Sequence, residues 1–267
     1  MNMLNIACGS RYHKDWTNID FHAVSEVVRK VNILGGLPYK DASFDAAYSS
    51  HFIEHLSPCQ VDAVLSEIHR ILKTGGVLRV VVPDLENICR EYLHRLQDAR
   101  EKDDERSNDL YEYIVVELLD QMVRSKPGGR LGELYKTMES NAELKKYVAE
   151  RTGVGKEEEK LVARRRRITF SKVANRLLYG YLKFLKLLVP EGIRDSVFCG
   201  ATIGELHKWM YDSHSLTKLL KRHGFRDVRT FSFNTSGIPE FNTYLLDCTA
   251  KGEPYKGTSS LFIEGIK

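Results

Sequence analysis

The sequence has few cysteines, and no two of them form a CxxC pair. An odd number cannot all be joined in disulfides within one chain, which argues against a disulfide framework. The five are Cys8, Cys59, Cys89, Cys199 and Cys248. We interpret them as reduced thiols and expect a cytoplasmic protein.

Long apolar runs are also lacking. No uninterrupted apolar stretch reaches the roughly 18 residues of a membrane-spanning helix. The first residues resemble a core strand, not the basic and apolar regions that precede a cleavage site, so we expect no secretion signal.

The excess of one sign of charge is small. The chain has 40 basic and 36 acidic residues, a net charge of +4, which is mild beside typical nucleic-acid-binding proteins. The basic run Arg164 to Arg167 has no aromatic residues interleaved for base stacking. We therefore predict no nucleic-acid partner.

The glycine-rich turn GxGxxG, which holds the pyrophosphate of dinucleotides, is absent. Its absence disfavours a dinucleotide enzyme and fits a ligand without a pyrophosphate. Internal repeats are absent as well.

What the sequence does contain is an alternation of strands and helices. Ser57 can cap a helix, Pro58 suits its first turn, and Gly75-Gly76 is expected to stop it. We predict a helix over 57–73 and strands over 3–7, 17–20, 27–33, 44–49 and 77–82, with the alternative that 27–30 ends a helix. Such a pattern indicates a mostly parallel sheet covered on both faces, which binds ligands at the carboxyl ends of its strands.

Beyond residue 84 the pattern is mainly helical. We divide the chain into residues 1–97, the first part of an α/β core, residues 98–200, a helical insertion or lid, and residues 201–267, the last part of the core. In this last part we predict a helix over 215–223 and strands over 225–233 and 260–267.

Three features at successive strand ends suggest one binding site. The turn Ala7-Cys8-Gly9 lets a ligand approach the backbone closely, and Asp20 offers a carboxylate to a ribose diol. Asn32-Ile33 offers an amide oxygen and an apolar wall to an adenine. Their order within some 30 residues suits a nucleoside that carries an amino acid.

Three segments are distinctive in combination: LNIACGSRYHKDWTNIDF (4–21), LPYKDASFDAAYSSHFIEHL (37–56) and EIHRILKTGGVLRVVVPDLE (67–86). They resemble class I S-adenosylmethionine-dependent methyltransferases of the methyltransferase type 11 kind. Three more, ELLDQMVRSKPGG (117–129), GELHKWMYD (204–212) and SLFIEGIK (260–267), are similar to a subgroup found with polysaccharide-biosynthesis glycosyltransferases. The resemblance implies a doubly wound, mostly parallel seven-stranded α/β fold and an enzyme that O-methylates a sugar or glycan intermediate.

The resemblance also implies roles for individual residues. It assigns Ala7, Cys8 and Gly9 to the methionine part of S-adenosylmethionine, Asp20 to the ribose and Asn32-Ile33 to the adenine. Ser49, Ser50 and His51 would lie near the transferable methyl. Apart from the resemblance, we expect Arg11, Tyr12 or Trp16 to help close the pocket, because the loop after Gly9 is short.

Two positions depart from the family pattern. The family more often has glycine at Ala7 and aspartate at Asn32. In addition, Asp20 follows Gly9 by only 11 positions, so the first helix is expected to be replaced by a loop. These departures keep a second hypothesis open, a non-catalytic cofactor-binding or scaffold protein with a methyltransferase fold.

The segment His51-Phe52-Ile53-Glu54-His55 also matches HxxEH, an inverted zinc-peptidase signature. That function requires a helix centred on 51–55 and a third ligand, whereas these residues precede the helix start at Ser57-Pro58. We therefore predict no metal and expect Glu54 and His55 to contact substrate or brace the site, with a metallopeptidase as the third hypothesis.

His207 is a second catalytic candidate. It lies in ELHKWMYD directly after the predicted lid, where Trp209 and Tyr211 are expected to present the acceptor. An imidazole titrates near neutrality, so His51 or His207 is the expected proton acceptor.

The segment 164–189 combines basic residues with many large apolar ones and suits an interfacial helix. A lipid-linked glycan substrate would make peripheral membrane contact reasonable. We favour the alternative, a lid helix packed on the core.

Overall fold

The computed structural model describes residues 1–138, 141–153, 180–181, 184–185, 187–190 and 204–267. One seven-stranded sheet has the order β3-β2-β1-β4-β5-β7-β6. The strands are β1 (Met3–Ile6), β2 (Thr17–Asp20), β3 (Val28–Lys30), β4 (Phe44–Ser50), β5 (Leu72–Pro83), β6 (Arg226–Phe231) and β7 (Ser260–Ile266). Strands β1 to β5 pair in parallel, and β7 is antiparallel to both β5 and β6. The prediction of a mostly parallel, seven-stranded α/β fold is confirmed.

The strand order reverses at β1. The chain passes outward through β2 and β3 and then returns to β4 on the other side of β1. Ile6 is in register with Ile19 of β2 and with Ser49 of β4. The segments that follow these three strands therefore leave the sheet at the same edge, where open α/β sheets bind ligands.

Two amphipathic helices cover one face of the sheet. Helix α1 (Pro58–Ile71) begins after Ser57, whose amide donates to Gln60 Oε1 at 2.9 Å in a capping box, and α8 (Ser213–Arg222) begins after the cap Asp212. Their apolar stripes pack on β1, β2, β4, β5 and β7 in the main core. The predictions over 57–73 and 215–223 located both helices.

The opposite face is covered differently. In the described part of the chain, Trp16 and residues from 238–246, including the 3-10 helix η4 (Phe241–Tyr244), pack there on β4, β5 and β7. The 7–16 segment between β1 and β2 contains no helix, as predicted from its length. A segment this short cannot form a crossover helix, so irregular chain buries that face.

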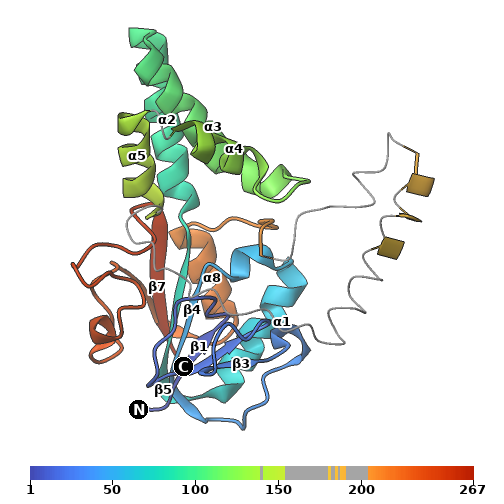
Figure 1. The fold of residues 1–267 in the computed structure, drawn as a ribbon. Coiled ribbons are helices and arrows are strands. Elements are labelled where there is room, and N and C mark those ends of the chain that lie inside the picture. Colours follow the sequence, from blue (N-terminus) through green and yellow to red (C-terminus); the bar gives the residue numbers. More distant parts are fainter. Residues whose placement is uncertain (139–140, 154–179, 182–183, 186, 191–203) are drawn as a thin grey trace.

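Helices α2 (Leu85–Lys102), α3 (Glu105–Val123), α4 (Gly129–Thr137) and α5 (Ala142–Thr152) form a layer beyond the sheet (Figure 1). Because α2 starts directly after β5, this layer stands at the carboxyl ends of the parallel strands. Helix α2 continues through residue 97, where we had divided the chain.

Two local predictions were wrong. Helix α1 ends at Ile71, and Gly75-Gly76 lies inside β5 instead of stopping the helix, because β5 already pairs with β4 at Leu72. Strand β3 is shorter than predicted, since Ile33 turns into the 3-10 helix η1 (Ile33–Gly35).

Most of the predicted interfacial segment 164–189 lies outside the described residues. Of its large apolar side chains that are described, four are between 57% and 71% exposed, namely Tyr181, Phe184, Leu187 and Leu188. These four do not pack on the core in the way we favoured. Within the described ranges, no helix has both the length and the apolar character needed to cross a membrane.

Candidate functional site

A cavity of about 190 Å³ opens where the strand order reverses. Residues 7–11 after β1 form one wall, and Ser50 and His51, at the end of β4, form another. The remaining wall includes Leu246, Tyr255 and Lys256, which precede β7. The cavity thus lies at the carboxyl ends of β1 and β4.

Asp20 is held against the turn that follows β1. The amide of Gly9 donates to Asp20 Oδ2 at 2.9 Å, and the amide of His22 donates to Oδ1, also at 2.9 Å. Gly9 has a φ of +54°, and a Cβ built on it would meet no atom within 4 Å. The backbone at Gly9 is therefore open to a ligand, with a fixed carboxylate beside it.

Two other cavity residues have a left-handed backbone, Ala7 with φ 54° and His51 with φ 49°. Residues other than glycine rarely adopt this backbone conformation, so contacts with the surrounding structure must stabilise both turns. Ala7 therefore keeps the backbone path that a glycine would take at this position. Burial, together with the charge of Asp20, raises the pKa of Cys8 to about 12, which keeps this thiol protonated.

The predicted adenine residues are placed less favourably. Asn32 is exposed and Ile33 is 1% exposed in the core, and neither lines the cavity. The Val31 amide nevertheless donates to the Asp20 carbonyl at 2.9 Å, so the ends of β2 and β3 are adjacent. Ser49 also lies outside the cavity, buried with no hydrogen-bond partner for Oγ among the described residues.

Behind His51 lies a buried carboxylate. His51 Nδ1 is 3.5 Å from Glu54 Oε1, and His51 Nε2 is 3.1 Å from Ser260 Oγ. Burial and the positive charge of Lys256 hold the pKa of His51 well below its usual value, so the imidazole is neutral at pH 7. Burial raises the pKa of Glu54 to about 8.

Glu54 and His55 belong to the 3-10 helix η2 (Ile53–His55), and α1 begins only at Pro58. His51 precedes η2 in a left-handed turn. The peptidase signature requires its two histidines to lie one turn apart on an α-helix. His51 and His55 do not lie in this way.

The segment 204–212 reaches η2 from the far end of the chain. The amides of Lys208 and Trp209 donate to the Glu54 carbonyl at 2.7 and 3.2 Å. His207 is 5% exposed, and its ring centroid is 4.9 Å from that of His55. Burial lowers the pKa of His207 to about 3.

None of the three candidates in this segment lines the cavity. His207 lies behind the cavity, close to Glu54 and His55. Tyr211 is buried in the main core, and Trp209 is 51% exposed. Burial, the largest cause, raises the pKa of Tyr211 to about 12.

Sequence reasoning missed the wall formed by Leu246, Tyr255 and Lys256. Arg11, which was predicted, contacts this wall: its guanidinium lies 4.0 Å from the Tyr255 ring centroid and donates to the Cys248 carbonyl at 2.7 Å. Burial lowers the pKa of Lys256.

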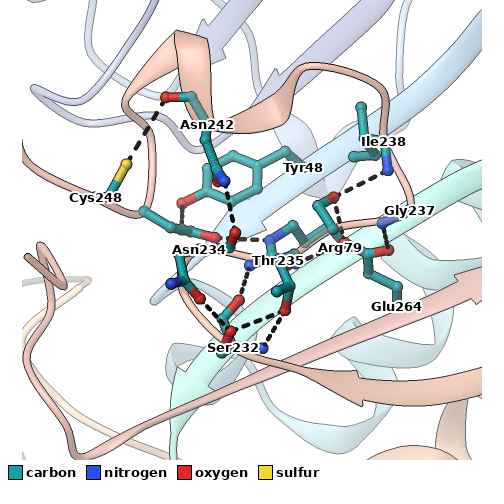
Figure 2. A network of polar contacts seen from close by, with 12 residues as sticks. Tyr48, Arg79, Ser232, Asn234, Thr235, Gly237, Ile238, Asn242, Cys248 and Glu264 are labelled. Carbon is teal, nitrogen blue, oxygen red and sulfur yellow. Dashed lines mark hydrogen bonds and ion pairs between the residues drawn. The ribbon is translucent and has the colours of Figure 1, made fainter. Parts of the chain in front are cut away.

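A buried ionic network holds this wall in place (Figure 2). Arg79 of β5 is fully buried and bonds Asp247 at 2.7 Å and Glu264 at 2.6 Å. Tyr48, which lines the cavity, donates to the other oxygen of Asp247 at 2.5 Å. The network joins β4, β5 and β7 to the 232–248 segment, so the cavity wall depends on contacts between residues far apart in the sequence.

Residues 6–80 match a family model described as a methyltransferase domain. The matched segment runs from the end of β1 into β5 and contains every residue that we assigned to the cofactor. The match implies S-adenosylmethionine as the cofactor.

An uncharacterized methyltransferase of Synechocystis sp. is 33% identical over 45 residues, which are 17% of this chain. The chain matches about a fifth, 21%, of the length of this curated relative.

Among solved structures, an S-adenosylmethionine-dependent methyltransferase from Archaeoglobus fulgidus is 12% identical, with a TM-score of 0.40 over 100% of this chain and 86% of the other. A possible histamine N-methyltransferase from Thermotoga maritima is 15% identical, with a TM-score of 0.38 over 100% of this chain and 82% of the other.

Proposed function

We propose that this chain is an S-adenosylmethionine-dependent methyltransferase that O-methylates a sugar or glycan. One observation carries the proposal: the Gly9 amide and the Asp20 carboxylate are hydrogen-bonded beside a cavity at the end of β1 and β4. This is the position at which a sheet with this strand order binds its ligand.

The residues at this position fit the cofactor. Around Gly9 the backbone faces open space, which suits the amino-acid end of S-adenosylmethionine. Each carboxylate oxygen of Asp20 accepts one amide hydrogen bond and keeps a lone pair for a ribose hydroxyl.

S-adenosylmethionine, when bound, supplies an electrophilic methyl group. The protein then has to align the acceptor, exclude water and remove the acceptor proton. His51 lines the cavity, and its neutral Nε2, now beside Ser260 Oγ, is the group that we assign to take a hydroxyl proton. The α2–α5 layer stands at the same edge of the sheet (Figure 1).

The lining of the cavity supports a hydroxylated acceptor. Lys256 and Arg11 can donate hydrogen bonds, and the Tyr255 ring offers an apolar face beside them. A sugar ring presents both hydroxyl groups and apolar faces, so this combination suits a sugar or glycan.

The test is transfer of a labelled methyl group from S-adenosylmethionine to free sugars, nucleotide-linked sugars and lipid-linked glycans. We expect His51→Asn, which tolerates the left-handed backbone, to lower turnover by about 100-fold or more while S-adenosylhomocysteine affinity is nearly kept. His94→Asn, on the exposed surface of α2, is the control.

Two results would count against the proposal. If the chain binds S-adenosylhomocysteine but methylates none of these acceptors, a non-catalytic cofactor-binding protein explains the site better. If transfer occurs and His51→Asn retains full turnover, His51 is not the base.

Peripheral membrane contact belongs to the same proposal. The exposed side chains of Phe184, Leu187 and Leu188 support it, because an interfacial helix inserts such residues between lipids. We expect the chain to sediment with anionic vesicles at low salt and less so at high salt. No binding at low salt would exclude this contact.

A further inference from the structure

A buried cluster behind the cavity contains Glu54, His55 and His207. One ligand atom from each residue lies within 4.8 Å of the other two. Glu54 and His55 come from η2, and His207 comes from the 204–212 segment, so two distant parts of the chain meet here.

The Glu54 carboxylate is the unusual member. Its side chain is 1% exposed, and neither of its oxygens has a hydrogen-bond partner among the described residues. The nearby nitrogens are His51 Nδ1 at 3.5 Å and His55 Nε2 at 3.9 Å, and neither makes a hydrogen bond to the carboxylate. An ionised carboxylate that is buried without a partner is strongly unfavourable, so Glu54 either holds a proton or binds a cation.

The hydrogen bond of His55 defines which of its nitrogens is available. Nδ1 lies 3.1 Å from the Leu206 carbonyl, which only accepts, so Nδ1 carries the hydrogen and Nε2 keeps its lone pair. Metal-binding histidines are oriented in this way by a backbone carbonyl on the other nitrogen. His55 is therefore set to coordinate through Nε2, on the side of Glu54.

Backbone hydrogen bonds hold His207 against the other two residues. The His207 amide donates to the Gln121 carbonyl of α3 at 2.8 Å, and the next amide, Lys208, donates to the Glu54 carbonyl at 2.7 Å. Tetrahedral ligands at about 2.0–2.2 Å from a zinc ion stand roughly 3.4 Å apart. The three ligand atoms, which lie within 4.8 Å of one another, are close to that spacing.

We propose that Glu54, His55 and His207 bind a divalent transition-metal ion, with Zn²⁺ as the best match. Two imidazole nitrogens and one carboxylate oxygen suit zinc and similar ions, whereas Mg²⁺ and Ca²⁺ favour oxygen ligands alone. Three protein ligands leave one coordination position, which a water molecule can fill. The ion would also tie the 204–212 segment to η2, beside His51.

This proposal departs from our prediction of no metal. The metallopeptidase hypothesis from the sequence used His51, Glu54 and His55, with the two histidines as ligands and a third ligand still required. The structure instead brings Glu54 and His55 together with His207, which no HxxEH spacing indicates.

The test measures metal directly and needs no activity. The untagged full-length chain is stripped with chelator, titrated with Zn²⁺ by calorimetry and with Co²⁺ by visible absorption, and its metal content is measured by mass spectrometry. We expect roughly one equivalent per chain and the intense absorption of tetrahedral Co²⁺. His55→Ala and His207→Ala should each weaken binding by at least about 100-fold, and His94→Ala, which is 53% exposed in its side chain, should not.

The wild-type measurement stands whether or not the variants fold, and circular dichroism checks their folding. Absence of stoichiometric metal in the wild-type chain would overturn the proposal and leave Lys256 to balance Glu54. Wild-type affinity in both ligand variants would overturn it as well. Titration with S-adenosylhomocysteine measures the cofactor site and not the metal site. Failure of the proposed function and failure of the metal proposal can therefore be told apart.

Discussion

The backbone amide of Gly9 donates a 2.9 Å hydrogen bond to the carboxylate of Asp20. This contact joins the turn after β1 to the end of β2 and leaves the open side of Gly9 facing the cavity. A ligand in the cavity meets the Gly9 backbone, and Asp20, which does not itself line the cavity, is bonded to that backbone.

Gly9→Ala should separate binding from folding. A left-handed alanine costs about 1–2 kcal/mol of stability, and its methyl group would enter the space meant for the cofactor. Gly75→Ala is a matched control, since Gly75 has a φ of +80° and no atom within 4 Å of a Cβ. We expect similar losses of unfolding free energy in both variants, but weaker S-adenosylhomocysteine binding in Gly9→Ala alone; equal affinities would show that no ligand approaches Gly9.

Arg79→Met should destabilise the fold strongly. The substitution leaves Asp247 and Glu264 buried without their counter-ion, which costs about 3–5 kcal/mol. Arg90→Met removes an exposed ion pair with Glu86 and should cost less than about 1 kcal/mol. Urea denaturation measures both, and a loss in Arg79→Met no larger than in Arg90→Met would show that the network contributes little.

Glu67 should make stability depend on pH in the acid range. Its carboxylate accepts hydrogen bonds from Arg70 and from the Leu37 amide, and together they lower its pKa from 4.5 to about 2. A lowered pKa stabilises the fold above pH 4.5, and this contribution is lost as the pH falls toward 2.

Glu67→Gln therefore should be less stable than wild type near pH 7, with the difference shrinking between pH 4.5 and 2. Denaturation curves across this range measure the difference. A gap that is constant with pH would mean that the charge of Glu67 has no part in it.

The first half of the site was predictable because its signals are local. A strand pattern precedes both Gly9 and Asp20, and it predicts two parallel strands. Because these strands pair in parallel, both residues lie at one edge of the sheet. The same reasoning located α1 from Ser57 and Pro58. The assignment of Asn32 to the adenine stays a prediction: η1 begins one residue later, and the Asn32 side chain is exposed outside the cavity.

The other half of the site depends on long-range contacts. Leu246 and Lys256 reach the cavity because Asp247 is bonded to Arg79 and Tyr48. Such a network cannot be predicted from the periodicity of the sequence. The approach of His207 to Glu54 likewise depends on backbone bonds between 207–209 and residues far away. Local patterns cannot encode these pairings.

Calorimetric titration of the chain with S-adenosylhomocysteine tests the cofactor site most directly. We predict binding by the wild-type chain, an affinity at least about 10-fold lower for Asp20→Asn, which loses a charged hydrogen-bond acceptor, and no change for the exposed Asp15→Asn. Absence of binding by the wild-type chain, or equal affinity in Asp20→Asn, would contradict the account.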